Sequence, residues 1–184
     1  SFPTRRSADL GGLFRSTDNG ANWTSVGGPL PTDFNGTSLR VSPSNPKRIY
    51  VAGGIVDDPS EGALERSDDG GETWKRFLVP LDPVRSFATL RIAFVHTTRP
   101  DLVVVWVDLP ELGTKAPDAM LATANGGQTW TTIYESTGDL PGQALSPDGK
   151  TVVLGGQFEG VQSADLDEAV ASYDRAIALK PDDP

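Results

Sequence analysis

Two arginines recur in nearly the same short context. Arg40 lies in the stretch SLRV, and Arg91, 51 residues further along, lies in the stretch TLRI. A guanidinium group presents several N–H donors in a rigid fork, so two such groups close together could bind an anion such as a carboxylate. Alternatively, each arginine ends a strand and pairs with a nearby carboxylate of the chain. Both interpretations stay open at this point.

Carboxylates gather in the stretches VDDPSEG (residues 56–62) and VDLPELGTKAPD (residues 107–118). The acidic residues considered there are Asp57, Asp58, Glu61, Asp108 and Glu111. Loops on one side of a rigid scaffold commonly carry binding function, and a solvated acidic surface is the alternative. Elsewhere Asp68 and Asp69 are adjacent, but two carboxylates fall short of the six to eight oxygen ligands that calcium takes. We therefore predict no metal site.

The other chemically active residues do not form a catalytic set. His96 is the only histidine, and one histidine builds neither a metal centre nor a catalytic triad. Tyr134 and Glu135 are neighbours on a predicted strand, so their side chains point to opposite faces. Cysteine is absent, and no glycine loop precedes a helix as it does in phosphate sites. We predict no catalytic residue and no cofactor within this chain.

The composition limits the fold and the partners. The chain has 184 residues, of which 37% are hydrophobic, and its 20 glycines and 15 prolines favour many turns and short strands. The formal net charge of -9 argues against binding nucleic acid or an anionic membrane surface. No apolar run reaches the length of a membrane span, so we expect no membrane insertion.

Three octamers share one pattern. They are STDNGANW (residues 16–23), SDDGGETW (residues 67–74) and TANGGQTW (residues 123–130). Asn-Gly and Gly-Gly pairs supply turns with positive φ, while the hydroxyl at position one and the Asp or Asn at position three can hydrogen-bond across the turn. The tryptophan can then cover the hairpin. Each octamer therefore predicts a hairpin, with arms such as LFRS and WTSV.

A second element recurs between the octamers. VSPSNPKRIYVAGG (residues 41–54), VHTTRPDLVVVWVD (residues 95–108) and LSPDGKTVVLGG (residues 145–156) each join a turn to a β-branched run. A period near 50 residues with several short strands per unit is typical of β-propeller blades. We predict an all-β fold, an incomplete propeller of about three four-stranded blades plus one C-terminal α-helix. A fourth blade begins at GVQSAD (residues 160–165) and is interrupted by that helix.

The octamers resemble the Asp box, or BNR repeat, of sialidase-like and sortilin-like β-propellers. The matching positions are Ser16, Asp18, Gly20, Trp23, Ser67, Asp69, Gly71, Trp74, Thr123, Asn125, Gly127 and Trp130. In the third copy Thr123 and Asn125 replace serine and aspartate, so we expect looser hydrogen bonding there. The resemblance implies a structural role for these residues, on the outer rim and away from the ligand site. It also implies an extracellular or cell-surface location.

The same resemblance raises the question of sialidase chemistry, which uses an arginine triad, a tyrosine–glutamate pair and an aspartate. Arg40 and Arg91 would lie at matching points of the innermost strands, but a third arginine and the typical Phe/Tyr-Arg-Ile-Pro stretch are missing. These two residues stay a candidate anion site only.

The two ends differ from the middle. Residues 1–10 resemble a translated sequencing adapter, and we expect them to be disordered or artefactual. Residues 11–164 are expected to hold the blades. Residues 165–184 show an apolar helical stripe and resemble the second helix of a tetratricopeptide repeat, with matches at Asp167, Glu168, Ala169, Tyr173, Ala176 and Pro181. We expect a helix and tail there.

Three hypotheses for function follow. The first is a non-catalytic propeller module that binds a protein or glycan ligand and whose remaining blades are missing. The second is a fragment of a sialidase-like glycoside hydrolase with its other catalytic residues in the missing blades. The third takes the helix at face value, as a propeller fused to a tetratricopeptide interaction scaffold.

Overall fold

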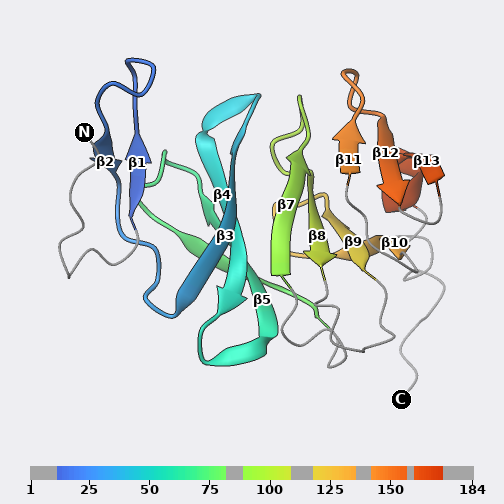
Figure 1. Ribbon diagram of the computed structural model, residues 1–184, viewed down its shortest axis with the longest axis horizontal. Helices are drawn as coiled ribbons and strands as arrows, with labels where there is room; N and C mark the ends of the chain where they lie inside the picture. The colour runs from blue at the N-terminus through green and yellow to red at the C-terminus, as the bar shows by residue number, and fades with distance from the viewer. Residues whose placement is uncertain (1–11, 82–88, 109–117, 136–141, 157–159, 172–184) are drawn as a thin grey trace.

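The computed structural model describes residues 12–81, 89–108, 118–135, 142–156 and 160–171. The strands in these ranges form four antiparallel sheets that stand side by side (Figure 1). Two sheets have four strands. They lie between a two-stranded hairpin at the N-terminal side and a three-stranded sheet at the C-terminal side.

The first sheet is the hairpin of β1 (Leu13–Arg15) and β2 (Thr24–Val26). The second contains β3 (Phe34–Ser42), β4 (Asn45–Ile55), β5 (Asp58–Ser67) and β6 (Lys75–Val79). The third contains β7 (Thr89–Val95), β8 (Val103–Asp108), β9 (Ala119–Thr123) and β10 (Thr131–Glu135). The fourth contains β11 (Gly142–Leu145), β12 (Thr151–Gly156) and β13 (Gly160–Asp165).

Within each sheet every strand pairs with the next strand of the chain, so each sheet is an antiparallel meander. This arrangement confirms the prediction of an all-β fold that forms an incomplete propeller. The number of complete blades differs slightly from the expectation, because two sheets rather than three have four strands. As predicted, each octamer connects the two arms of a hairpin: β1 to β2, β5 to β6 and β9 to β10.

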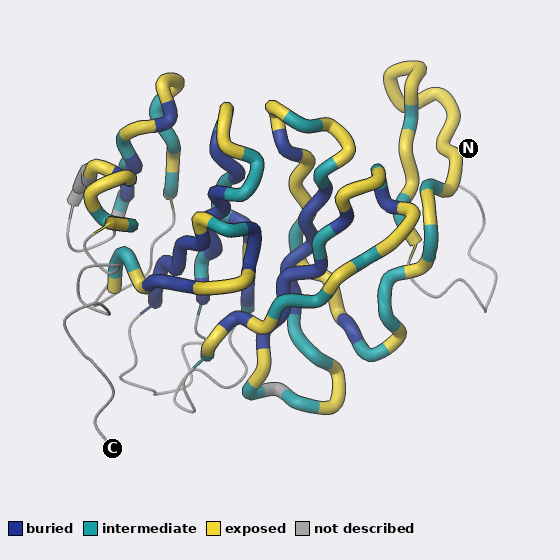
Figure 2. The backbone as a smooth tube through the Cα atoms, turned by 180° about the vertical axis from the view of Figure 1, so that it is seen from behind, coloured by how far each residue is buried: buried dark blue, intermediate teal, exposed yellow. Residues whose placement is uncertain are grey.

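Strand β8 shows why the sheets stack. Its sequence VVVWVD is apolar almost throughout, as expected for a strand that is covered on both faces. Because side chains alternate, Val103, Val105 and Val107 join the core shared with the second sheet. Val104 and Trp106 point the other way and pack with the fourth sheet. Figure 2 shows the buried backbone running through the middle sheets.

These two cores hold neighbouring sheets together. The first core joins Tyr50 and Leu64 of the second sheet to Leu90, Ile92 and other residues of the third. Burying one such side chain contributes roughly 1.5–3 kcal/mol of hydrophobic free energy, so the shared cores dominate over any single polar contact. Stacked sheets with a shared core on each face are the arrangement that a blade repeat requires.

The chain turns helical directly after β13. Residues 166–171 are helical, and the Asp165 carboxylate caps this turn by accepting a bond from the Glu168 N–H at 2.9 Å. Leu166 is fully buried in the core between the third and fourth sheets, and the Arg99 guanidinium meets the Asp167 carboxylate at 2.6 Å. The helix thus interrupts the fourth sheet after its third strand, as the sequence predicts. Residues 1–11 and the rest of the predicted 165–184 segment lie outside the described residues, so the domain boundaries stay predictions.

Candidate functional site

The three octamer turns have the same hydrogen-bonded geometry. The hydroxyl at position one accepts the N–H of the glycine at position five, at 2.8 Å for Ser16, 2.7 Å for Ser67 and 2.8 Å for Thr123. The Asp or Asn at position three accepts the N–H of position seven, at 2.9, 3.0 and 2.9 Å in the three copies. These backbone bonds are equally short in the third copy. The bond between the side chains at positions one and three is longer there, 3.0 Å against 2.7 and 2.8 Å, so the expected looser bonding is limited to that pair.

Glycine is required where these turns bend. Gly71 has a φ of 101° and Gly127 a φ of 107°, values in the region that side chains disfavour. A Cβ at Gly127 would also lie 2.8 Å from the Phe77 side chain of the preceding sheet. The glycines therefore serve both the turn and the close approach of neighbouring sheets.

The carboxylates of the first two turns are stabilised in their ionised form. The Asn22 N–H and the Ser16 hydroxyl both donate to Asp18 and lower its pKa to about 2. The Thr73 hydroxyl and N–H lower the pKa of Asp69 in the same way. Hydrogen bonds to the ionised carboxylates lower both pKa values. Burial opposes this shift only weakly, because both carboxylates lie at the surface. The identification of these turns as Asp boxes stays a prediction, but their shared geometry is a property of the structure.

The tryptophans of the octamers differ in their surroundings. The Trp23 Nε1–H donates to the Gly20 carbonyl of its own turn at 3.1 Å, and the indole is 42% exposed. The Trp74 Nε1–H reaches the Gly28 carbonyl of the preceding segment at 3.3 Å. Trp130 is 8% exposed and packs in the core between the second and third sheets. From the first octamer to the third, the indole therefore contacts the preceding part of the structure more extensively.

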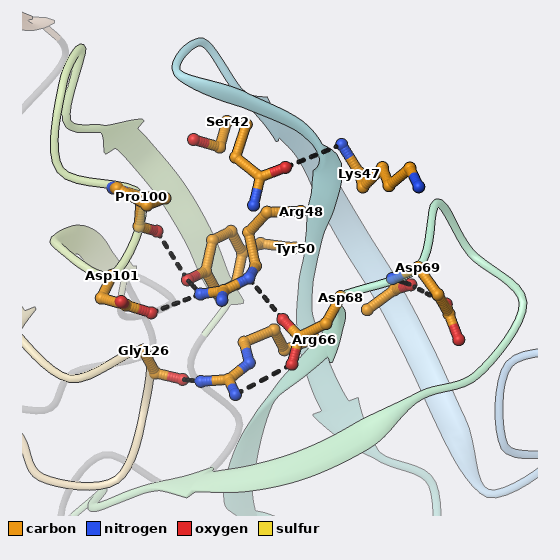
Figure 3. A network of polar contacts seen from close by, with 12 residues as sticks. Ser42, Lys47, Arg48, Tyr50, Arg66, Asp68, Asp69, Pro100, Asp101 and Gly126 are labelled. Carbon is orange, nitrogen blue, oxygen red and sulfur yellow. Dashed lines mark hydrogen bonds and ion pairs between the residues drawn. The ribbon is translucent and has the colours of Figure 1, made fainter.

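A polar network that the sequence did not predict joins the second and third sheets (Figure 3). Arg48 forms ion pairs with the carboxylates of Asp68 and Asp101. The Arg66 guanidinium also meets Asp68, at 3.1 Å, and donates to the Gly126 carbonyl of the third turn at 3.0 Å. Asp68 therefore forms ion pairs with two guanidinium groups. This role accounts for an aspartate at the second position of the octamer, and it does not require a calcium ion.

Tyr50 extends this network into the core. Its hydroxyl donates to the Pro100 carbonyl at 2.7 Å and accepts from Arg48 at 3.1 Å. Burial raises the pKa of Tyr50, so it stays a neutral donor. Burial alone would lower the pKa of Arg48, but its bonds to Tyr50 and Asp101 raise it instead. The sequence signal that could have indicated this network is the pair of charged residues at Arg66 and Asp68, on both sides of the turn serine.

A second polar cluster lies on the opposite face of the second sheet. Arg76 binds Asp33 with two parallel bonds of 2.7 and 2.8 Å and also donates to Glu65 at 2.6 Å. Glu65 is 1% exposed, so its charge depends on this arginine. The hydrogen bond with Asp33 is the main cause that raises the pKa of Arg76. This cluster ties the loop before β3 to β5 and β6.

The candidate anion-binding arginines lie on the first strands of the second and third sheets, as expected. They are not at matching levels: Arg40 is opposite Tyr50 and directly precedes the Val41–Ile49 pair, whereas Arg91 is opposite Trp106 and lies four residues before the Val95–Val103 pair. The Arg40 guanidinium donates to the Leu39 carbonyl at 2.9 Å, and the Arg91 guanidinium lies 5.8 Å from the centre of the Trp106 ring. The contacts of Arg40 and Arg91 among the described residues share no partner, so the anion site stays a prediction.

The remaining candidates are placed as follows. The His96 Nε2 contacts the Gly149 carbonyl at 3.0 Å, while its Nδ1 accepts the N–H of Arg99 at 3.1 Å. Burial lowers the pKa of His96, so the neutral ring serves as a structural link to the fourth sheet. Asp58 begins β5 and accepts the N–H of Ser60 at 3.0 Å. Glu111 and most of the 107–118 stretch lie outside the described residues.

Tyr134 and Glu135 end β10, where they pair with Met120 and Ala119 respectively. Tyr134 packs against the core between the third and fourth sheets. In the part of the chain that the structure describes, no three His, Asp or Glu side chains gather in a way that could hold a metal ion. No helical stretch in these ranges has the length and apolar character that a membrane span requires.

Comparison with known proteins agrees with the propeller architecture. The Sortilin-Vps10 family, described as sortilin, neurotensin receptor 3, matches residues 11–150. Xyloglucanase Xgh74A of Acetivibrio thermocellus is 27% identical over 138 residues, which cover 68% of this chain and 15% of the xyloglucanase. The chain therefore spans well under two thirds of the length of this curated relative.

Two solved structures share the fold. An ancestral GH74 enzyme superposes with a TM-score of 0.53 and 22% identity, over 85% of this chain and 20% of that enzyme. The GH74 xyloglucanase from Xanthomonas campestris gives a TM-score of 0.54 and 13% identity, over 85% of this chain and 26% of that enzyme. At these identities the similarity establishes the architecture and leaves the chemistry to be argued from the residues.

Proposed function

Because the chain belongs to the Sortilin-Vps10 family, we propose that it forms part of the propeller of a glycoside hydrolase of the xyloglucanase kind. In this proposal the described blades provide the scaffold and contacts to a glycan, and the catalytic groups lie in other blades of a longer protein. We also propose an extracellular or cell-surface location, where a polysaccharide substrate is found. The observation that carries the proposal is the 27% identity with a xyloglucanase over 138 residues.

The geometry of the described residues supports this division of labour. The charges of Arg48 and Arg76 are paired within the protein: the Arg48 cluster joins the second and third sheets, and the Arg76 cluster ties the loop before β3 to β5 and β6. Tyr134 and Glu135 are successive residues of one strand, so they cannot form the tyrosine–glutamate pair of a sialidase. A polysaccharide of the xyloglucan type is neutral, which agrees with a chain whose net charge is -9.

Affinity electrophoresis of the chain in gels that contain xyloglucan tests this proposal. We expect retardation by xyloglucan, none by the anionic polymer polygalacturonate, and no release of reducing ends by the chain alone. Circular dichroism of the same sample checks that the strands are folded. Unchanged mobility of a folded chain would overturn glycan contact, and release of reducing ends would overturn the scaffold role.

The leading hypothesis from the sequence is a non-catalytic binding module. It differs from this proposal in the activity that is expected of the longer protein that contains this chain. A longer protein that contains this chain is expected to depolymerise xyloglucan. If that protein binds xyloglucan without cleaving it, the module hypothesis is correct and the hydrolase proposal is wrong.

A further inference from the structure

His96 lies where the third sheet meets the fourth, in the turn between β7 and β8. Its side chain is buried, with 4% of the residue exposed. Nδ1 accepts the N–H groups of Thr98 and Arg99, at 3.2 and 3.1 Å, so the neutral ring carries its proton on Nε2. The Nε2–H then donates to the Gly149 carbonyl, at 3.0 Å, in the turn between β11 and β12. One ring nitrogen therefore serves its own turn, and the other serves the neighbouring sheet.

The backbone of Gly149 lies directly against the imidazole. Gly149 has a φ of 76°, and a Cβ there would lie 2.3 Å from the His96 Nε2, so glycine is required at this position. The Gly149 N–H closes its own turn by donating to the Ser146 carbonyl at 2.8 Å. At the end of this turn, the Lys150 carbonyl accepts the Leu166 N–H at 2.7 Å. The ring thus contacts a hydrogen-bonded turn that is also joined to the start of the helical residues.

The charged groups around His96 come from three segments. They are Arg99 in the β7–β8 turn, Asp148 and Lys150 on the two sides of Gly149, and Asp167 in the helical turn. The Arg99 guanidinium disfavours a second positive charge and the Asp167 carboxylate favours one, but these two groups pair with each other at 2.6 Å. The Asp148 carboxylate is bonded to the Ser146 hydroxyl within its own turn. Burial is the largest influence, and it lowers the pKa of His96.

Protonation of the ring changes what Nδ1 can do. The added hydrogen would point at two backbone N–H groups, so two hydrogen bonds are lost and donors face a donor. The positive charge strengthens the Nε2–H bond to Gly149. This one gain is smaller than the loss of two bonds together with the burial of a charge, because the net effect lowers the pKa of His96. The protonated ring therefore gains by turning toward water, and it then leaves Gly149.

We propose that His96 is a pH-sensitive switch: its neutral ring holds the β11–β12 turn and helical residues 166–171 against the third sheet, and its protonation releases them. The remaining core between the third and fourth sheets stays packed, because its other buried side chains contribute far more than one ring. Leu166 belongs to this core, so the release uncovers one part of it. The switch does not depend on the proposed function.

The direction of the pH effect follows from the two states of the ring. In the released state the ring has its ordinary pKa of 6.5, and in the closed state its pKa is lower. The stabilisation of the closed state is therefore fully present above pH 6.5 and is lost as the pH falls from 6.5 toward the lower value. Carboxyl groups ordinarily titrate near pH 4, so a change from about pH 7.5 to about pH 5 acts on the one histidine side chain.

The rate at which a buried thiol is labelled tests this switch. The chain has no cysteine, so one introduced thiol reports on one core. Ala122→Cys places it between the third and fourth sheets, and Ala119→Cys, on the same strand, places it between the second and third. The rate with a pyridyl disulfide is divided by the rate for the same chain in urea at the same pH. From about pH 7.5 to about pH 5 this ratio is expected to rise about 10-fold at position 122, the effect of two lost hydrogen bonds, and to stay constant at position 119.

Two variants remove the titration and keep part of the hydrogen bonding. His96→Asn retains an acceptor for the N–H groups of its own turn, and His96→Gln retains a donor that can reach Gly149. Circular dichroism at neutral pH checks that both are folded. In both variants the labelling ratio at position 122 is expected to be independent of pH in this range. In the parent chain, the NMR signal of the single histidine is expected to titrate with a midpoint below pH 6.5.

Three results would overturn the switch. The first is a labelling ratio at position 122 that does not change with pH in the parent chain. The second is an acid-induced rise that persists in the folded His96 variants, or that is equal at positions 119 and 122, since the chain then opens for another reason. The third is a histidine midpoint at or above pH 6.5, which needs no variant.

Discussion

The first and the third octamer turns have the same local hydrogen bonds and opposite surroundings. In both, a hydroxyl accepts a glycine N–H at 2.8 Å and the third residue accepts a backbone N–H at 2.9 Å. Trp23 is nevertheless 42% exposed, whereas Trp130 is 8% exposed. The third turn lies against the Phe77 and Arg66 side chains of the preceding sheet, and the first turn belongs to a hairpin of two strands.

This comparison separates two levels of structure. The turn is specified by residues within eight positions, so it forms wherever they occur. Burial of the indole depends on a neighbouring sheet, which the octamer itself does not encode. The contribution of an octamer to stability should therefore follow its neighbours and differ among the three copies.

The largest expected effect is on the free energy of unfolding, and it differs between Trp130 and Trp23. Trp130→Ala should lower the free energy of unfolding by about 3–5 kcal/mol, because it leaves a cavity in a core. Trp23→Ala should cost less than about 1 kcal/mol, because the indole is already partly in water. Urea denaturation followed by circular dichroism measures both values. Equal losses would mean that the octamers stabilise the chain through their local turns alone.

A smaller effect is expected at Asp68, which follows the serine of the second turn. Asp68→Ala leaves the two nearly buried guanidinium groups of Arg48 and Arg66 without this carboxylate. Because the Asp68 side chain is 40% exposed, we expect a loss of only about 1–2 kcal/mol. Thr17→Ala, the equivalent change in the first turn, is the matched control and should have little effect. If both variants lose the same stability, the network between sheets does not contribute as described.

The smallest effect is a difference in acid response between the first and third turns. The pKa of Asp18 is lowered from 3.8 to about 2, so its stabilising bonds are present above pH 3.8 and are lost as the pH falls to about 2. Asn125 does not titrate. NMR spectra should therefore show the Asn22 amide signal moving between pH 4 and pH 2 while the Thr129 amide signal stays fixed. Movement of both signals together would indicate general unfolding instead.

The sequence predicted the local and repeating features correctly. The turn residues, the hairpin arms and the interruption of the fourth sheet at residue 165 follow from short-range chemistry and from the repeat. The β-branched run VVVWVD is a strand as predicted, and the structure adds that both of its faces are covered by neighbouring sheets.

Features that depend on register and on contacts between sheets were not predictable. The spacing of 51 residues suggested that Arg40 and Arg91 are equivalent, but the Val41–Ile49 and Val95–Val103 pairs repeat at 54 residues, so the arginines lie opposite different partners. The network of Arg48, Asp68 and Asp101 joins residues that are up to 53 positions apart. A single sequence does not reveal such pairs, because each member alone is an ordinary surface charge.

A crystal structure of this chain is the most direct test of the central claim, which is that consecutive antiparallel sheets pack face to face as propeller blades. We expect the Ile92 N–H to donate to the Ser38 hydroxyl, which it meets at 2.7 Å, and the Tyr50 hydroxyl to donate to the Pro100 carbonyl. Both bonds cross from the second sheet to the third. Sheets that are separated, or an order other than β3-β4-β5-β6 beside β7-β8-β9-β10, would contradict it.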